Sequence, residues 1–229
     1  ARSSLGRGES IIVPQPVDPM DGHRAFRVKA EAGVRDGDAI GFLGVRPANH
    51  DITDSDVGFL SGTQIEFFNL LFSYGKDDFN VEEAGLINIV SLAPRTKFFK
   101  PISWRLNTGW DRNYLSESTK FTANASGGLT WANELGYVYL LADLLFYTDR
   151  DLTAGIGGIA GAVIYEGKGF KTNLEATERL FDTGYDQFLF SASQHYRSSQ
   201  NTSLSVAYDY VEKYQGSWDT VKFTFDYYF

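Results

Sequence analysis

The last ten residues constrain the fold of this chain more than any other stretch. From Thr220 to Phe229 they read Thr-Val-Lys-Phe-Thr-Phe-Asp-Tyr-Tyr-Phe, with apolar and polar side chains in alternation. A period of two is typical of a β-strand with one apolar and one polar face. The chain is therefore expected to end on an amphipathic strand whose final residue is aromatic.

Such an ending has two interpretations. A terminal strand that closes on Phe resembles the sorting signal of bacterial outer-membrane barrels, with Phe225, Tyr227 and Phe229 as its residues. The alternative is the closing strand of a soluble barrel or sandwich. The remaining strands have to separate these two interpretations.

Composition bears on the choice between a transmembrane barrel and a soluble fold. The 229 residues allow one sizeable domain, and aromatic residues make up 15% of them. No run approaches the ~20 apolar residues that a membrane helix needs. In a transmembrane barrel, however, lipid-facing and lumen-facing residues alternate and cancel in a hydropathy window. The net charge of -8 argues against a nucleic-acid partner, and the absence of Cys fits either the cytosol or the cell envelope.

Alternating segments of about ten residues recur along the whole chain, separated by turns. They fall at residues 24–35, 39–47, 63–75, 80–92, 102–110, 120–133, 137–147, 154–165, 170–180, 187–197, 202–213 and 218–229. An even number of strands of this length suits an apolar band of about 25 Å, and closure leaves no unpaired edge in lipid. We therefore predict an all-β fold, a closed antiparallel transmembrane β-barrel of about 12 strands with both termini in the periplasm.

This topology predicts where the links lie. Residues 1–22, with Pro14, Pro16 and Pro19, are expected to form a Pro-rich periplasmic linker or plug segment, and residues 23–229 the barrel. The two longest links, 49–62 and 93–101, then fall on the periplasmic side, which indicates a functional surface on that rim. Charged side chains of both signs on the lumen face are expected to fill the interior. Because a barrel must cross the inner membrane, the sequence is expected to be a mature chain or the tail of a longer one.

Four motifs carry a family resemblance. They are Asp18–Arg24 (DPMDGHR), Arg46–Asp54 (RPANHDITD), Gly62–Phe67 (GTQIEF) and Ser91–Trp104 (SLAPRTKFFKPISW). The chain resembles the C-terminal region of proteobacterial envelope proteins that carry an Lnb-type N-terminal periplasmic domain. The resemblance implies a barrel that anchors a periplasmic domain with a papain-like cysteine site. This chain has no Cys, so the nucleophile of that domain is not in it.

Two groups of residues are candidates for a site. The first forms the expected periplasmic rim: His23, Arg24, Arg46, His50, Asp51, Asp54, Arg95 and Trp104. A His beside several Asp residues could bind a metal or act in acid–base catalysis, but such residues also cap turns, and we favour capping. The second group, His195, Ser205 and Asp209, shares a predicted lumen face and is a weak catalytic candidate. No catalytic residue, metal or cofactor is expected in this chain.

These observations favour an integral outer-membrane barrel that anchors or positions a periplasmic domain or partner and is not itself an enzyme. One alternative is a barrel enzyme that acts on lipid or lipoprotein acyl chains, and another is a narrow diffusion channel. The expected partners are outer-membrane lipid, a periplasmic domain in cis or in trans, and the barrel-assembly machinery during insertion. The expected location is the outer membrane of a Gram-negative bacterium.

Overall fold

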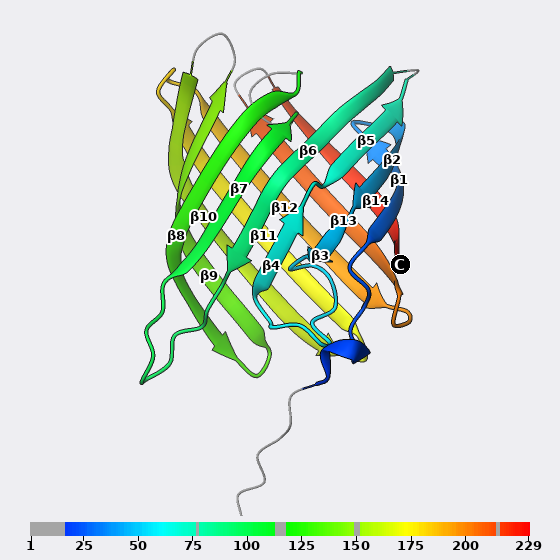
Figure 1. Ribbon diagram of the computed structural model, residues 1–229. Coiled ribbons are helices and arrows are strands. Elements are labelled where there is room, and N and C mark those ends of the chain that lie inside the picture. Colours follow the sequence, from blue (N-terminus) through cyan, green and yellow to red (C-terminus); the bar gives the residue numbers. More distant parts are fainter. Residues whose placement is uncertain (1–16, 77, 113–117, 149–151, 214–215) are drawn as a thin grey trace, which may run out of the picture.

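The computed structural model describes residues 17–76, 78–112, 118–148, 152–213 and 216–229, and these form a closed antiparallel β-barrel (Figure 1). The first part of the wall consists of β1 (Arg27–Arg35), β2 (Asp38–Arg46), β3 (Ala48–His50), β4 (Thr63–Phe67), β5 (Leu70–Gly75), β6 (Asp78–Ser91) and β7 (Ser103–Asp111). The second consists of β8 (Lys120–Asn133), β9 (Gly136–Thr148), β10 (Leu152–Gly167), β11 (Phe170–Phe181), β12 (Asp186–Arg197), β13 (Thr202–Lys213) and β14 (Gly216–Tyr228).

These fourteen segments make twelve barrel strands. Val45 pairs with Leu70 and Ala48 with Phe67, so one register runs through both β2/β3 and β4/β5. Each pair of segments is one strand, interrupted on one side at Pro47, which has no backbone N–H for the ladder. The ring closes where β1 pairs with β14 and β6 with β7. The prediction of a closed barrel of about 12 strands is confirmed.

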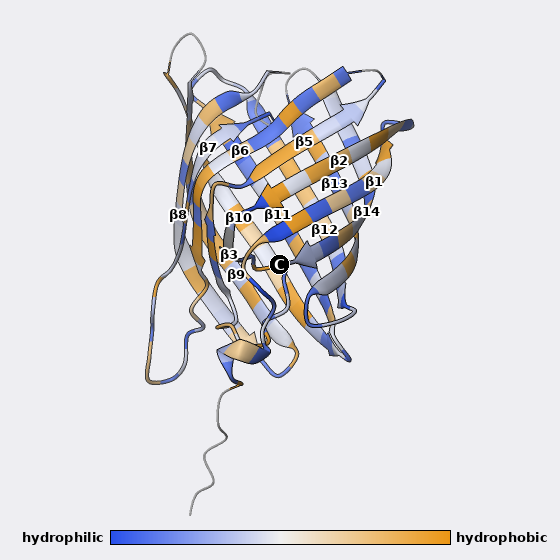
Figure 2. Ribbon diagram, turned by 45° about the vertical axis from the view of Figure 1, so that its right-hand side comes forward, coloured by the Kyte–Doolittle hydropathy of each residue, from blue (hydrophilic) through white to orange (hydrophobic). Residues whose placement is uncertain are grey.

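The alternation seen in the sequence sets the two faces of the wall. On β14, Val221, Phe223 and Phe225 are 43–52% exposed on the outside, whereas Thr220 and Thr224 are 2% exposed inside. Figure 2 shows the same alternation of hydrophobic and hydrophilic residues along neighbouring strands. Within the described ranges, no helix is long and apolar enough to span a membrane.

Both described chain ends lie at one end of the barrel, here called the proximal end. The links 51–62, 92–102, 134–135, 168–169 and 198–201 lie there too (Figure 1). Pro19–Asp21 forms a short 3-10 helix beneath the barrel, capped by the Asp18 side chain. The proposed segment 1–22 is described only from residue 17, and its first sixteen residues lie outside the described part of the chain.

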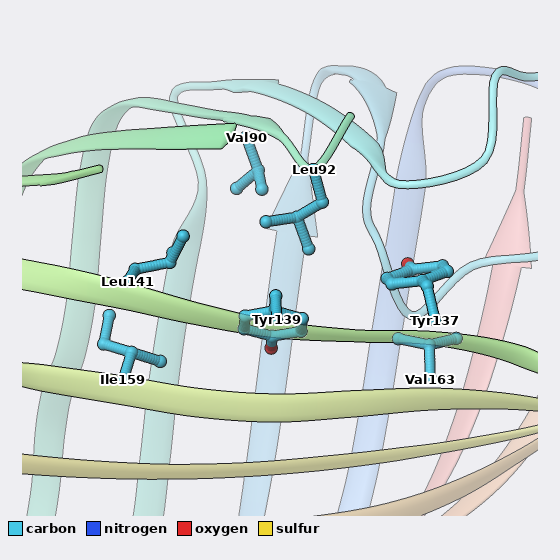
Figure 3. Packing of buried hydrophobic residues seen from close by; sticks show 7 residues of the cluster. All are labelled: Val90, Leu92, Tyr137, Tyr139, Leu141, Ile159 and Val163. Carbon is cyan, nitrogen blue, oxygen red and sulfur yellow. The ribbon is translucent and has the colours of Figure 1, made fainter. Parts of the chain in front are cut away.

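Apolar side chains and ion pairs both occupy the interior. On β9, Tyr137, Tyr139 and Leu141 face inward and join Ile159 and Val163 of β10 in an apolar cluster with Val90 and Leu92 (Figure 3). Farther along the lumen, Arg105 makes a bidentate ion pair with Glu175 at 3.0 and 2.6 Å, and Tyr139 donates to the same carboxylate. The expected filling by side chains of opposite charge is present, and a dry apolar part accompanies it.

Candidate functional site: the plug cluster at the proximal end

The link after β3 folds into the lumen. Asp54 is only 4% exposed, and the carbonyl oxygens of Ile52 and Asp54 accept hydrogen bonds from the Lys171 ammonium on β11. Ile52 packs against the apolar cluster of the barrel interior. Residues 51–62 therefore form a plug across the proximal end, in a place where the sequence alone suggested a rim loop.

Asp54 is the centre of the plug. Its Oδ2 accepts from Arg46 at 2.6 Å, and its Oδ1 accepts from Arg27 at 3.1 Å. The Tyr228 hydroxyl donates to Oδ1 at 2.6 Å. Burial raises the pKa of the Asp54 carboxyl, but Arg46 and Arg27 outweigh burial and hold that pKa well below its usual value. Asp54 is thus a buried anion held by three barrel side chains.

A wider set of ionised groups surrounds this centre, which we call the plug cluster. Its carboxylates are Asp51, Asp54, Asp56, Glu66 and Asp226, and its cations are Arg27, Arg46 and Lys171. The Tyr165 hydroxyl of β10 donates to Asp56. Because buried ions need partners, this network fixes the plug to at least four strands of the wall.

Two imidazoles lie beside Asp54. His23 precedes β1 and His50 ends β3, and their Nε2 and Nδ1 atoms are 3.1 Å apart. Phe59 stacks on His50 at 4.3 Å and on His23 at 4.5 Å between ring centroids, and Tyr228 covers the other side of His23. Burial lowers the pKa of His23 below its usual value, although the carboxylate of Asp54 acts in the opposite direction. The pair is buried, with His23 7% and His50 4% exposed.

The segment before the barrel is fastened to the same end. Gln200 donates to the carbonyl oxygens of Met20 and Gly22, and Arg197 donates to that of Asp21. With His23 buried, these contacts fasten the chain to the link between β12 and β13 where it enters the barrel.

The predicted rim residues divide into two groups. His23, Arg46, His50, Asp51 and Asp54 converge in the plug cluster and are not a surface of the rim. Arg24 is exposed, Arg95 is half-buried on the link 92–102, and Trp104 is 43% exposed on the outer face of β7. Sequence reasoning missed Arg27, Glu66, Lys171, Asp226 and Tyr228 as members of the cluster. The only sequence signal for these residues is that the alternation on each of their strands places them on the lumen face.

The weak catalytic candidates lie on one lumen face. His195 pairs across the ladder with Ser205, and Asp209 pairs with Ser191. The His195 ring contacts Ser193 at 3.2 Å, and the Asp209 carboxylate is paired with the Lys222 ammonium at 2.7 Å. Within the described part of the chain, His195 thus contacts Ser193 and Asp209 contacts Lys222, and no hydrogen bond joins His195, Ser205 and Asp209 to one another.

Two polar cavities remain within the lumen. One, of about 170 Å³, borders the plug and is lined by Arg27, Lys29, Arg46 and Glu66 among others. The other, of about 380 Å³, lies toward the far end, between Arg35, Glu82 and Asp209. Cavities of this size have room for water or a small molecule.

A closed barrel with a polar, filled interior and an apolar exterior is the structure of an integral outer-membrane protein. Within that class, the chain belongs to the family described as Domain of unknown function (DUF7840), whose model matches residues 16–228. None of the curated proteins compared with the chain matches it.

Solved structures with the same fold are porins and channels. The NanC porin has a TM-score of 0.56 at 10% identity, over 88% of this chain and 100% of its own. The KdgM porin has a TM-score of 0.51 at 8% identity, over 89% and 99% of the two chains. An outer membrane channel from Pseudomonas putida F1 has a TM-score of 0.50 at 11% identity, over 99% of this chain and 100% of its own. At these identities the likeness concerns the fold.

Proposed function

We propose that this chain is a sealed outer-membrane barrel that holds a periplasmic domain or partner at its proximal end. The observation that carries the proposal is the fastening of residues 17–26. Gln200 and Arg197 hold the 3-10 helix, and His23 is buried in the plug cluster. A polypeptide that precedes this segment would leave the barrel at the proximal end, from a segment that is fastened to the barrel.

Exposed apolar side chains at the same end support the proposal. Met20 is 83% exposed, Leu60 75% and Phe98 90%, all on segments outside the barrel wall. Large apolar side chains in such positions are typical of protein or membrane contacts. The resemblance seen in the sequence suggests a periplasmic domain of the Lnb type, in cis or in trans, as the partner.

Site-specific photo-crosslinking in intact cells tests the anchor. A photoreactive amino acid placed at Phe98 or Leu60 is expected to form an adduct with one folded periplasmic polypeptide. The same group at Tyr74, which lies toward the far end and is 58% exposed, is the matched control and is expected to give none. Protein adducts of equal yield at Tyr74 and Phe98, or no protein adduct at either proximal position, would contradict the proposal.

The second candidate function is a narrow diffusion channel. The two polar cavities in the lumen favour it, and solved barrels of similar fold are described as porins and a channel. A channel would require a path past the plug, whose Asp54 is paired with Arg46 at 2.6 Å. Swelling of liposomes that contain the wild-type protein, in small neutral solutes, would favour this function.

A further inference from the structure

The histidine pair of the plug has a geometry that a hydrogen-bond network alone does not explain. His23 Nδ1 lies 2.8 Å from the carbonyl oxygen of Arg24, so Nδ1 carries a proton and donates it. In the neutral ring, His23 Nε2 is then a bare lone pair. It faces His50 Nδ1 at 3.1 Å and Asp54 Oδ2 at 3.6 Å. A lone pair beside a carboxylate requires a cation or a proton between them.

The second ring nitrogen of His50 also lacks a partner. If His50 Nδ1 donates to His23 Nε2, the His23 lone pair is satisfied, but His50 Nε2 is left as a lone pair without a donor. That atom is buried, has no hydrogen-bond partner among the described residues, and faces Asp56 Oδ1 at 3.9 Å. The opposite tautomer would place a proton on Nε2, toward Asp56, and would leave two lone pairs facing each other between the rings. A metal ion between the rings resolves both conflicts.

We propose that His23 Nε2, His50 Nδ1 and Asp54 Oδ2 bind a divalent transition-metal ion of the Zn²⁺ type, which clamps the plug to the barrel. The three atoms lie within 4.8 Å of one another. Their separations are 3.1, 3.6 and 4.0 Å. With Zn–N and Zn–O bonds of about 2.0–2.1 Å, the edges of a tetrahedral site measure about 3.3 Å. Two of the separations lie within about 0.3 Å of this edge, and the third, between His50 Nδ1 and Asp54 Oδ2, would have to shorten by about 0.7 Å.

The surroundings are those of a metal site. Histidine ligands of metals donate their second ring N–H to a carbonyl or carboxylate, which fixes the tautomer. His23 does so to Arg24, and His50 would do so to Asp56 once its Nδ1 binds the ion. Asp54 Oδ2 already accepts from Arg46 and from the backbone N–H of Asp51, so an ion bound there would displace or share one of these hydrogen bonds. The stacked ring of Phe59 covers both imidazoles.

The charges do not oppose a cation at this place. Five carboxyl groups and three cationic side chains make up the plug cluster, so the carboxyl groups outnumber the cations. Imidazole and carboxylate donors suit zinc and its neighbours.

Such an ion would join three separate parts of the chain: the segment before β1, the end of β3 and the link 51–62. This role differs from anchoring and from conduction, and the inference holds or fails independently of both. The inference is tested by measuring the binding of metal to the purified barrel.

The test is a Zn²⁺ titration of the folded full chain in detergent after treatment with a chelator. The wild type is expected to bind one Zn²⁺ per chain. His23→Gln and His50→Gln are each expected to weaken binding by more than about 100-fold, since loss of a ligand exceeds the 10- to 100-fold effect of an outer-shell partner. His195→Gln removes the third histidine of the chain and is the matched control, expected to bind as the wild type does.

A second measurement protects the test against variants that fail to fold. X-ray absorption at the zinc edge of the wild-type complex is expected to show two imidazoles and oxygen donors at about 2.0–2.1 Å. The proposal is overturned if the wild type takes up no stoichiometric Zn²⁺ or if the spectrum shows fewer than two imidazoles. It is equally overturned if the His23 and His50 variants bind as tightly as the His195 variant.

Discussion

Asp54→Asn is the substitution expected to loosen the plug most directly. It keeps the size of the side chain but removes the negative charge that Arg46 and Arg27 contact at 2.6 and 3.1 Å. The three side chains are at most 5% exposed, so water does not replace the lost partner. Breaking a buried ion pair on one side costs about 3–5 kcal/mol.

That cost falls on the closed plug and not on the barrel wall, because the strand ladders do not depend on Asp54. At about 1.4 kcal/mol for each factor of ten, the open fraction of the plug should rise by about two to three and a half orders of magnitude. Hydrogen exchange of peptides that cover residues 51–62 measures this opening directly.

The matched control is Asp38→Asn. Asp38 pairs with Lys76 near the far end, where the two side chains are 45% and 70% exposed. An exposed pair contributes about 0–1 kcal/mol, so exchange in residues 51–62 should not change. Equal exchange of the link in the wild type and in Asp54→Asn would refute the reasoning that Asp54 holds the plug closed.

Three further predictions concern the wall, the lumen and assembly. Gly157→Ala should destabilise the barrel by at least about 1–3 kcal/mol in urea unfolding, because a Cβ there would lie 1.8 Å from a backbone oxygen of β11. Gly127→Ala is the control: a Cβ there would meet no atom within 4 Å, and the variant should be as stable as the wild type. Equal stability of the two variants would contradict this packing. Arg105→Met and Glu175→Gln should couple by about 1–3 kcal/mol in a double-mutant cycle, since their bidentate pair is only 17% and 29% exposed; additive effects would show that the pair is not formed. Deletion of Phe229 should lower the fraction of chains that migrate as folded barrel on unheated gels, and an unchanged fraction would remove its role as a sorting signal.

The wall could be predicted from the sequence because period-two alternation is a local signal. Val221, Phe223 and Phe225 show their outward face in the sequence and keep it in the barrel. The prediction that His195 and Ser205 face one lumen side follows from the same rule, and the two residues pair across the ladder.

The plug could not be predicted in this way. The link after β3 has no period, and its polar composition fits a surface loop as well as a lumen plug. What draws Asp54 inside is the meeting of Arg27 from β1 and Arg46 from β2 at one height in the lumen. The proximity of these side chains depends on the register between strands and on closure of the barrel, and neither can be read from a local stretch of sequence. For the same reason, the sequence predicts His23 and His50 on a rim, whereas the two side chains lie together inside.

Planar-bilayer recording of the wild-type chain tests most directly whether the barrel is sealed. We predict no stepwise conductance from the wild type, and stable steps of porin type from Asp54→Asn, whose plug should open far more often. Stable channels in the wild type, equal to those of the variant, would contradict a plug held by Asp54 and would favour a diffusion channel.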